Sequence, residues 1–207
     1  MGYKVEQIKA VGITNQRETT ICWDTNTGEP LYNAIVWPDT RTATLVRELK
    51  KRSGAEILLQ LCGLPLSTYP SSVKFLWMHD HCEAVKKAYD EGRCSFGTVD
   101  SWLIYRLNGG KNAGVHVTDT TNASRTMFMN IHTLKYDATL LDFFEVDPKK
   151  LILPKIVSDY IVRCLERYQD HGMPRRSIGG VSGTVWILSR RSKEYLWYWL
   201  FSALQCG

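Results

Sequence analysis

The sequence predicts an α/β fold for this chain of 207 residues. Runs rich in β-branched and aromatic residues come first, separated by turn residues such as Asn26-Thr27-Gly28, and predict strands at 4–14, 19–23 and 31–37. Longer segments with apolar residues at helical spacing follow them, and predict helices at 42–52, 55–62, 71–91 and 99–107. One more helix is expected within 131–144, ending near Asp147-Pro148.

Composition is that of an ordinary globular chain. Hydrophobic residues make up 44% and charged residues 23%, which indicates one domain, or one domain plus a tail, with enough apolar side chains for a core. The formal net charge is +5, but residues 158–207 hold seven basic against four acidic side chains and carry much of the excess. The body of the chain has no basic run interleaved with aromatics, so we expect no nucleic-acid partner.

The cysteine and histidine patterns predict neither disulfides nor a metal site. The six Cys form no Cys-x-x-Cys pair and no secretory signal peptide is recognised, which indicates reduced thiols of a cytoplasmic protein, packed as small apolar groups. His79 and His81 stand two apart on a predicted helix and therefore point to different sides of it, and no distant pair of ligands completes a site with Cys82.

Two segments carry local structural predictions. In 71–81, the spacing of Val73, Leu76 and Trp77 predicts a core stripe, and Lys74 is interpreted as a solvated or salt-bridged helix residue. Thr98 precedes a predicted helix as its N-cap, with Asp100 favoured in the first turn. Three short polar side chains are expected to bond to neighbouring backbone and fix an irregular loop: Asp119, Asn122 and Ser124.

Residues 11–20, Val-Gly-Ile-Thr-Asn-Gln-Arg-Glu-Thr-Thr, form the most informative motif. Taken alone, the Arg17-Glu18 pair is most often a solvated surface couple, since surface charges are the default. Further blocks follow it in order: Trp23-Asp24 and Thr27 to Trp37 with Asp39 to Thr42, Tyr69 to His81, Gly97 to Ile104, and Val117 to Met127 with Asn130 to Leu134.

From Val5 to Val157 these blocks resemble the FGGY carbohydrate kinases, and among them the glycerol kinases. The resemblance implies a ribonuclease H-like domain of the actin/hexokinase type, here the N-terminal kinase domain without its first strands. Arg125-Thr126 and Asn130 to Leu134 are typical of glycerol kinases. The resemblance thus divides the chain into a partial kinase domain, 1–157, and a divergent basic and aromatic tail, 158–207.

The resemblance also implies the residues that contact the substrate glycerol. Arg17 and Glu18 match the pair that holds its hydroxyls, one as a forked donor and the other as an ionised acceptor. Trp37 matches the residue whose flat face lies against the carbon backbone, and Tyr69 the residue whose hydroxyl contacts glycerol. Pro38 departs from the expected Gln-like residue and removes a backbone donor at the edge of the site.

The activity implied for the intact enzyme is transfer of the γ-phosphoryl group of ATP, with Mg²⁺, to glycerol, giving glycerol 3-phosphate. The sequence contains no Gly-Asp-Gln, the segment that supplies the catalytic Asp in the family, and no Gly-rich phosphate loop. We therefore assign no catalytic, nucleotide-binding or metal-binding residue, and expect a truncated, inactive fragment that holds the glycerol-contacting half-site.

Two alternatives remain open. The chain would be a non-catalytic polyol-binding or regulatory fragment, which would associate with a full-length kinase subunit, or it would belong to another FGGY sugar kinase. The apolar stretch 195–201 is well short of the roughly 20 residues that span a bilayer, so no transmembrane segment is predicted. A cytoplasmic protein is expected; association with mitochondria is known in the family, although no segment here encodes it.

Overall fold

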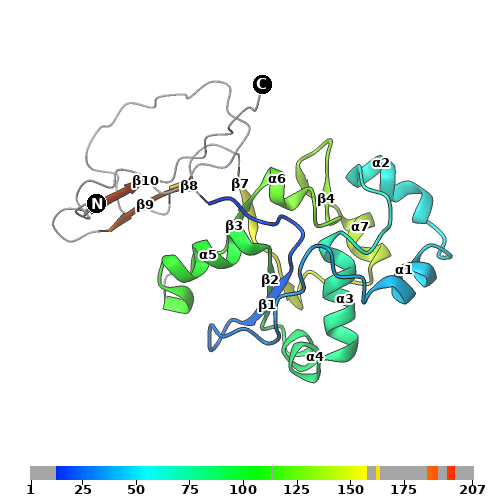
Figure 1. The fold of residues 1–207 in the computed structure, drawn as a ribbon, viewed down its shortest axis with the longest axis horizontal. Coiled ribbons are helices and arrows are strands. Elements are labelled where there is room, and N and C mark those ends of the chain that lie inside the picture. Colours follow the sequence, from blue (N-terminus) through cyan, green and yellow to red (C-terminus); the bar gives the residue numbers. More distant parts are fainter. Residues whose placement is uncertain (1–12, 113, 158–161, 164–185, 191–194, 199–207) are drawn as a thin grey trace. The chain divides into compact units, whose positions relative to one another are not determined.

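The structure, a computed structural model, describes residues 13–112, 114–157, 162–163, 186–190 and 195–198. The chain divides into two compact units, Asn15–Ile156 and a second made of Met1–Thr14 with Val157–Gly207. In the second unit, β8 (Val162–Arg163), β9 (Trp186–Arg190) and β10 (Tyr195–Tyr198) form a sheet in the order β10-β9-β8 (Figure 1). Strands β9 and β10 pair antiparallel, and β8 pairs with β9 in parallel.

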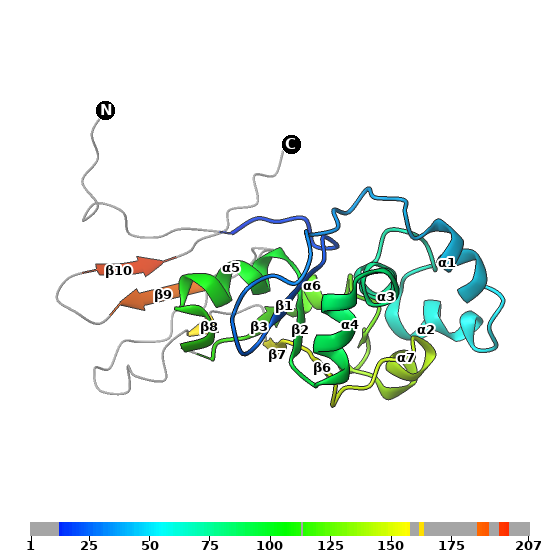
Figure 2. The same cartoon turned by 90° about the horizontal axis from the view of Figure 1, so that it is seen from below.

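The first unit is built around a small mixed sheet. Its strands β1 (Ile21–Asp24), β2 (Cys94–Gly97) and β6 (Leu151–Ile152) follow the order β1-β2-β6, with β1 and β2 antiparallel and β2 and β6 parallel. Figures 1 and 2 show helices α3 (Ser71–His81) and α4 (Glu83–Asp90) on one side of the β1–β2 pair and α5 (Val99–Leu107) on the other. Both faces of the sheet are therefore covered.

The alternation of side chains along β1 divides the core in two. Cys22 belongs to the main cluster with Phe96 of β2, whereas Ile21 and Trp23 point to the opposite face and pack with Tyr105 of α5. This is the period-2 geometry of a strand, applied to a strand that is buried on both faces. All four residues of β1 are buried, and Asp24, the one charged residue among them, pairs with Arg93.

The main cluster is lined by aromatic side chains from distant parts of the chain. The Phe128 ring lies 5.5 Å from Phe96 and 5.8 Å from Phe144, measured between centroids and with T-shaped geometry in both pairs. The helices around this cluster are α1 (Ala43–Leu49), the 3-10 turn η2 (Ala55–Ile57), α2 (Leu58–Cys62), α3, α4 and α7 (Ala138–Phe143). These edge-to-face contacts bury large apolar surfaces and order the centre of the unit.

Short elements complete the first unit. They are η3 (Gly110–Asn112), β3 (Val117–Asp119), α6 (Thr120–Ala123), β4 (Met129–Asn130), β5 (Lys135–Tyr136) and β7 (Lys155–Val157). Strand β3 pairs with β7, and β4 with β5 as a hairpin. In the hairpin turn, Asn130 Oδ1 accepts from the amides of His132 and Thr133 at 2.9 and 3.3 Å, which is the Asx-type turn chemistry that short polar residues supply.

The predicted helices are largely confirmed. Helix α5 coincides with the predicted 99–107, while the single helix predicted for 71–91 is wrong, because Cys82 adopts an extended backbone (φ −125°, ψ 108°) between α3 and α4. Of the helix expected within 131–144, α7 fills only Ala138–Phe143, after the hairpin. Strand β2 was not predicted. Within the predicted strand 31–37 the structure has one isolated bridge, Thr20 to Ile35, and a second bridge, Trp23 to Pro30, lies just before that range.

Some predictions fall outside the described residues. Most of the predicted strand 4–14 lies outside the described residues. The expectation that the domain lacks its first strands concerns the same part of the chain and stays a prediction. In residues 158–207 only β8, β9 and β10 are described, so the predicted division at residue 157 stays a prediction. Within the described part of the chain, no helix has the length and apolar character that crossing a membrane requires.

Two local predictions are wrong. Lys74 is fully buried, and its ammonium donates to the carbonyls of Thr68, Tyr69 and Pro70. Its position in the first turn of α3 directs the side chain back under the preceding loop, where solvent is excluded. Thr98 occupies the N-cap position of α5, but its hydroxyl donates to the Asp100 carboxylate and caps no amide.

Candidate functional site

Three chain segments bring the predicted glycerol residues into one neighbourhood. The backbone amides and carbonyls of Thr20 and Ile35 bond to each other at 3.0 and 3.1 Å, and the Trp37 amide donates to Thr19 Oγ1 at 3.2 Å. Residues 18–19 thereby lie beside residues 36–37. The third segment is the loop that carries Tyr69 into α3, where Ser71 Oγ donates to the Glu18 carbonyl at 3.2 Å.

The start of α3 is anchored by backbone bonds instead of a side-chain cap. The first amides of a helix have no partner within it. Here the Ser71 amide donates to the Arg125 carbonyl at 3.4 Å, and the Ser72 amide to the Thr126 carbonyl at 3.1 Å. Pro70, at the N-cap position, needs no such partner because it lacks an N–H. The turn after α6 is therefore fixed against the loop of Tyr69.

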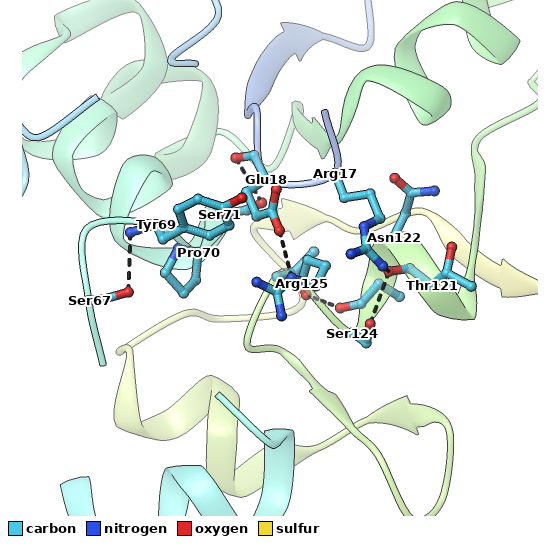
Figure 3. A network of polar contacts seen from close by, with 12 residues as sticks. Arg17, Glu18, Ser67, Tyr69, Pro70, Ser71, Thr121, Asn122, Ser124 and Arg125 are labelled. Atoms are coloured by element: carbon cyan, nitrogen blue, oxygen red, sulfur yellow. Dashed lines mark hydrogen bonds and ion pairs between the residues drawn. The ribbon is translucent and has the colours of Figure 1, made fainter. Parts of the chain in front are cut away.

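Glu18 is the buried carboxylate of the neighbourhood. Its residue is only 4% exposed, and Arg125 Nε lies 2.6 Å from its Oε1 (Figure 3). A carboxylate at this depth is costly unless it is paired and hydrogen-bonded, so Arg125 compensates the burial. The interpretation of Arg17-Glu18 as a solvated surface couple is excluded for Glu18.

The Tyr69 ring lies beside this ion pair and contacts Trp37 in turn. The Tyr69 ring makes a T-shaped contact with Trp37, with centroids 5.4 Å apart, and the Arg125 guanidinium carbon lies 5.6 Å from the Tyr69 centroid. Trp37 keeps 40% of its surface exposed, unusual for an indole next to a packed ring. The exposed part of Trp37 and the ion pair that contacts Tyr69 therefore provide apolar and polar groups in one neighbourhood.

Arg17 is oriented differently from Glu18. Its side chain is exposed, and Nη1 donates to the Thr121 carbonyl at 3.4 Å, on the other side of Arg125 from Tyr69 in Figure 3. The structure thus brings Glu18, Trp37 and Tyr69 together, whereas the exposed side chain of Arg17 bonds to α6. Because Thr121 belongs to α6, this hydrogen bond places the Arg17 guanidinium near the turn after α6 that contains Arg125.

The buried ammonium of Lys74 forms hydrogen bonds with the backbone of the loop that carries Tyr69. Burial lowers the pKa of this ammonium to about 8, while the charges of Glu18 and Asp39 oppose the shift. The carbonyls of Thr68 and Pro70 accept from it at 3.1 and 3.3 Å, and the Tyr69 carbonyl accepts as well. Three successive carbonyls around one ammonium hold the backbone of the loop in a single conformation.

Sequence reasoning missed the roles of Arg125 and Lys74. Arg125 was noted only as typical of one group of kinases, and its partner Glu18 stands 107 positions away. A possible signal for Lys74 was its place in the apolar segment between Val73 and Phe75. The prediction of bonds to neighbouring backbone is confirmed for two of its three residues: Asp119 Oδ1 accepts from the Asn122 amide at 2.6 Å, and Ser124 Oγ donates to the Thr121 carbonyl at 2.9 Å. The Asn122 side chain bonds instead to the side chains of Asp119 and Asn15, and the expected irregular loop is the short helix α6, with Asp119 as its N-cap.

The described residues provide no clear metal centre. Across the part of the chain that the structure describes, no group of three or more His, Cys, Asp or Glu side chains could hold a metal ion. His79 is paired with Asp80 at 3.3 Å, and His81 stacks on Trp77 with centroids 4.4 Å apart. These residues do not fit a Mg²⁺ site by themselves.

Comparison with solved structures identifies the fold. The crystal structure of Plasmodium falciparum glycerol kinase with ADP aligns with a TM-score of 0.65 and 41% identity, covering 72% of this chain and 28% of that one. A gluconate kinase from Lactobacillus acidophilus aligns with a TM-score of 0.59 and 28% identity, over 76% of this chain and 29% of that one. The α/β unit therefore has the actin/hexokinase-type fold of the sugar kinases.

Comparison of sequences gives the family. The model of the FGGY family of carbohydrate kinases, N-terminal domain, matches residues 2–167. The chain belongs to this family. Curated glycerol kinases are similar to it: that of Methylorubrum extorquens (strain PA1) is 44% identical over 182 residues, or 88% of this chain and 35% of that protein. That of Arabidopsis thaliana is 49% identical over 154 residues, or 73% and 29%. The chain thus spans about a third of the length of these relatives.

Proposed function

We propose that this chain is part of a glycerol kinase and contributes its glycerol-contacting half-site. The observation that carries the proposal is the buried Glu18 carboxylate, whose partner Arg125 lies over the Tyr69 ring, with Trp37 packed against that ring. Glycerol has hydroxyls that need charged donors and acceptors, and carbons that favour an aromatic face. Similarity to several glycerol kinases supports glycerol over other polyols.

Each residue of the proposed half-site has a role that fits its surroundings. Glu18 accepts hydrogen bonds from hydroxyls, and the exposed guanidinium of Arg17 donates a hydrogen bond to a hydroxyl. Trp37 presents its accessible ring to the carbon chain, and the Tyr69 hydroxyl completes the polar contacts. The exposed guanidinium of Arg17 would leave the Thr121 carbonyl to reach a bound hydroxyl.

We further propose that the 207 residues alone do not transfer phosphate. In the complete kinase, ATP with Mg²⁺ would supply the phosphoryl group, and other segments would supply the base and the nucleotide contacts. The role left to this chain is to bind and orient the acceptor hydroxyl. Formation of glycerol 3-phosphate by the purified chain with ATP and Mg²⁺ would overturn this part of the proposal.

Calorimetric titration of glycerol into the purified chain tests the binding proposal. We expect saturable binding that Arg17→Ala and Trp37→Ala each weaken about tenfold, since a lost charged or aromatic contact is worth about 1–2 kcal/mol. Both side chains are partly or fully exposed, so neither substitution disturbs the core. Arg47→Ala, on the exposed side of α1, is the matched control. Unchanged affinity in both site variants, or no binding by the folded wild-type chain, would refute the half-site.

A further inference from the structure

Arg125 contacts two of the proposed glycerol residues at once, from a fourth segment of the chain. Its Nε donates to Glu18 Oε1 at 2.6 Å, and its guanidinium carbon lies 5.6 Å from the Tyr69 ring centroid (Figure 3). Its side chain retains 26% exposure, whereas that of Glu18 retains 6%. The guanidinium thus lies between the buried carboxylate and the aromatic side of the site.

The backbone of Arg125 is held firmly. Its amide donates to the Asn122 carbonyl at 3.0 Å, and its own carbonyl accepts from Ser71 at the start of α3. Ser71 in turn bonds to the Glu18 carbonyl through its hydroxyl. Because both ends of the ion pair are tied to the same helix start, the guanidinium and the carboxylate have little freedom to move apart.

The ion pair also limits how Glu18 can meet a ligand. A carboxylate has two oxygens, and the one bonded to Arg125 is Oε1. A charge-assisted bond of this kind is directional and about twice as strong as a neutral one. With Oε1 bonded to Arg125, the rotation of the carboxylate is restricted, and Oε2 is the oxygen that would accept a hydrogen bond from a polyol hydroxyl.

We infer that Arg125 is a positioning residue for the polyol acceptor, which orients the Glu18 carboxylate and supports the Tyr69 ring without contacting the ligand itself. This inference rests on the proposed function. It gives a physical role to the Arg125-Thr126 pair that the sequence associates with glycerol kinases. It also predicts that the effect of Arg125 on binding passes through Glu18.

A double-mutant cycle measured by calorimetric titration of glycerol tests this inference. We expect Arg125→Met to weaken binding about tenfold or more, because a lost charged hydrogen bond is worth about 1.5–3 kcal/mol. In the Glu18→Gln background the same substitution should change the affinity less than about twofold, since coupled residues are not additive. Arg125→Lys, which keeps the charge but not the Nε geometry, should restore part of the affinity.

Arg106→Met is the matched control. Arg106 also pairs with a carboxylate, Glu29 at 3.2 Å, and also lies over an aromatic ring, that of Trp102 at 5.3 Å, but on α5. Its substitution should leave glycerol affinity unchanged in both backgrounds. Equal loss from Arg125→Met in the wild-type and Glu18→Gln backgrounds, or no loss in either, would overturn the inference.

A second measurement separates this inference from the proposed function. The Nε–H resonance of Arg125 in ¹⁵N spectra, assigned by its disappearance in Arg125→Met, should shift on Glu18→Gln in the absence of any ligand. If the wild-type chain does not bind glycerol, the proposed function fails, and this resonance decides the pairing alone. A Glu18-dependent shift then supports Arg125 as the residue that orients Glu18, and an unchanged resonance removes that role.

Discussion

Neighbouring residues in this chain have opposite surroundings. Arg17 is exposed and Glu18 is buried, although they are adjacent and together form the motif that first indicated polyol binding. The difference arises from the turn before β1, in which the Thr19 amide donates to the Gln16 carbonyl at 3.2 Å. The half-site therefore depends on individual buried groups. Lys74 is another of them, and its ammonium bonds to three backbone carbonyls.

Replacing Lys74 with Met should destabilise the loop that carries Tyr69. The substitution keeps the apolar stem but leaves the carbonyls of Thr68, Tyr69 and Pro70 without their donor. We expect the free energy of unfolding to fall by about 2–3 kcal/mol, as for other buried groups left unsatisfied. Urea unfolding measures this, with Lys51→Met as control, because Lys51 is exposed and only pairs with Glu48. Equal stability of the Lys74→Met and Lys51→Met variants would contradict the structural role.

At the scale of elements, the start of α5 is a buried polar junction with β3. The Asp100 carboxylate accepts from the hydroxyls of Thr98 and Thr118, the latter at 2.9 Å. Burial raises the pKa of Asp100 to about 7; the nearby Asp119 carboxylate adds to this, while the two hydroxyls oppose it. The sequence predicted Thr98 at the N-cap position and Asp100 in the first turn, and both lie there, although the hydroxyl of Thr98 does not cap the helix.

The junction predicts a pH dependence of stability. The pKa of Asp100 is higher in the folded than in the unfolded chain, so its favourable contribution is complete below about pH 4 and is lost as pH rises through about 7. Asp100→Asn cannot ionise. We therefore expect the wild type to lose stability relative to Asp100→Asn when pH is raised from 4.5 to 7.5, as measured by urea unfolding at each pH.

The comparison of these two proteins also removes a competing effect. Burial lowers the pKa of His116 to about 4, so this group reduces stability as pH falls through the range between about 6.5 and 4. His116 is present in both proteins, and its contribution cancels in their difference. If the stability difference stays constant, or favours the wild type at higher pH, ionisation of Asp100 does not reduce the free energy of unfolding and the prediction is wrong.

At the scale of the whole molecule, a row of aromatic rings in the main cluster of the first unit joins β2, the end of α7 and the segment before β4. Phe96, Phe128 and Phe144 are fully buried and contact one another in sequence, across almost 50 residues of chain. The turn that supplies Arg125 leads directly to Phe128. Packing of this core and positioning of the candidate site therefore share the same backbone.

Truncation of the central ring, Phe128, should lower the free energy of unfolding more than a substitution on the surface does. Phe128→Ala removes both ring contacts and leaves a cavity, which costs about 3–5 kcal/mol in other proteins. Leu107→Ala, at the exposed end of α5, should change the free energy of unfolding by less than about 0.5 kcal/mol. Both are measured by urea unfolding monitored by circular dichroism. Similar midpoints for the two variants would contradict a single cooperative core.

Local patterns in the sequence predicted the long helices well. Helix α5 has the predicted bounds, and α3 begins at the predicted residue, because apolar spacing and the preceding Pro70 are local signals. Strand β2 was missed since Cys94-Ser95-Phe96-Gly97 is short and gains its structure from its neighbours β1 and β6. The break at Cys82 has no local signal either; its thiol contacts the Leu31 carbonyl at 3.8 Å, 51 residues away.

The sequence by itself determined the class of the fold, the family and the residues proposed to meet glycerol, because ordered motifs and periodicity are carried by neighbouring residues. Only the tertiary structure decided which of those residues are buried and which charge faces which. Glu18 pairs with Arg125 and Lys74 binds three carbonyls because α3, the turn after α6 and the segment before β1 meet in space. Burial and long-range pairing depend on contacts between segments that are far apart in the sequence, and local sequence patterns do not specify those contacts.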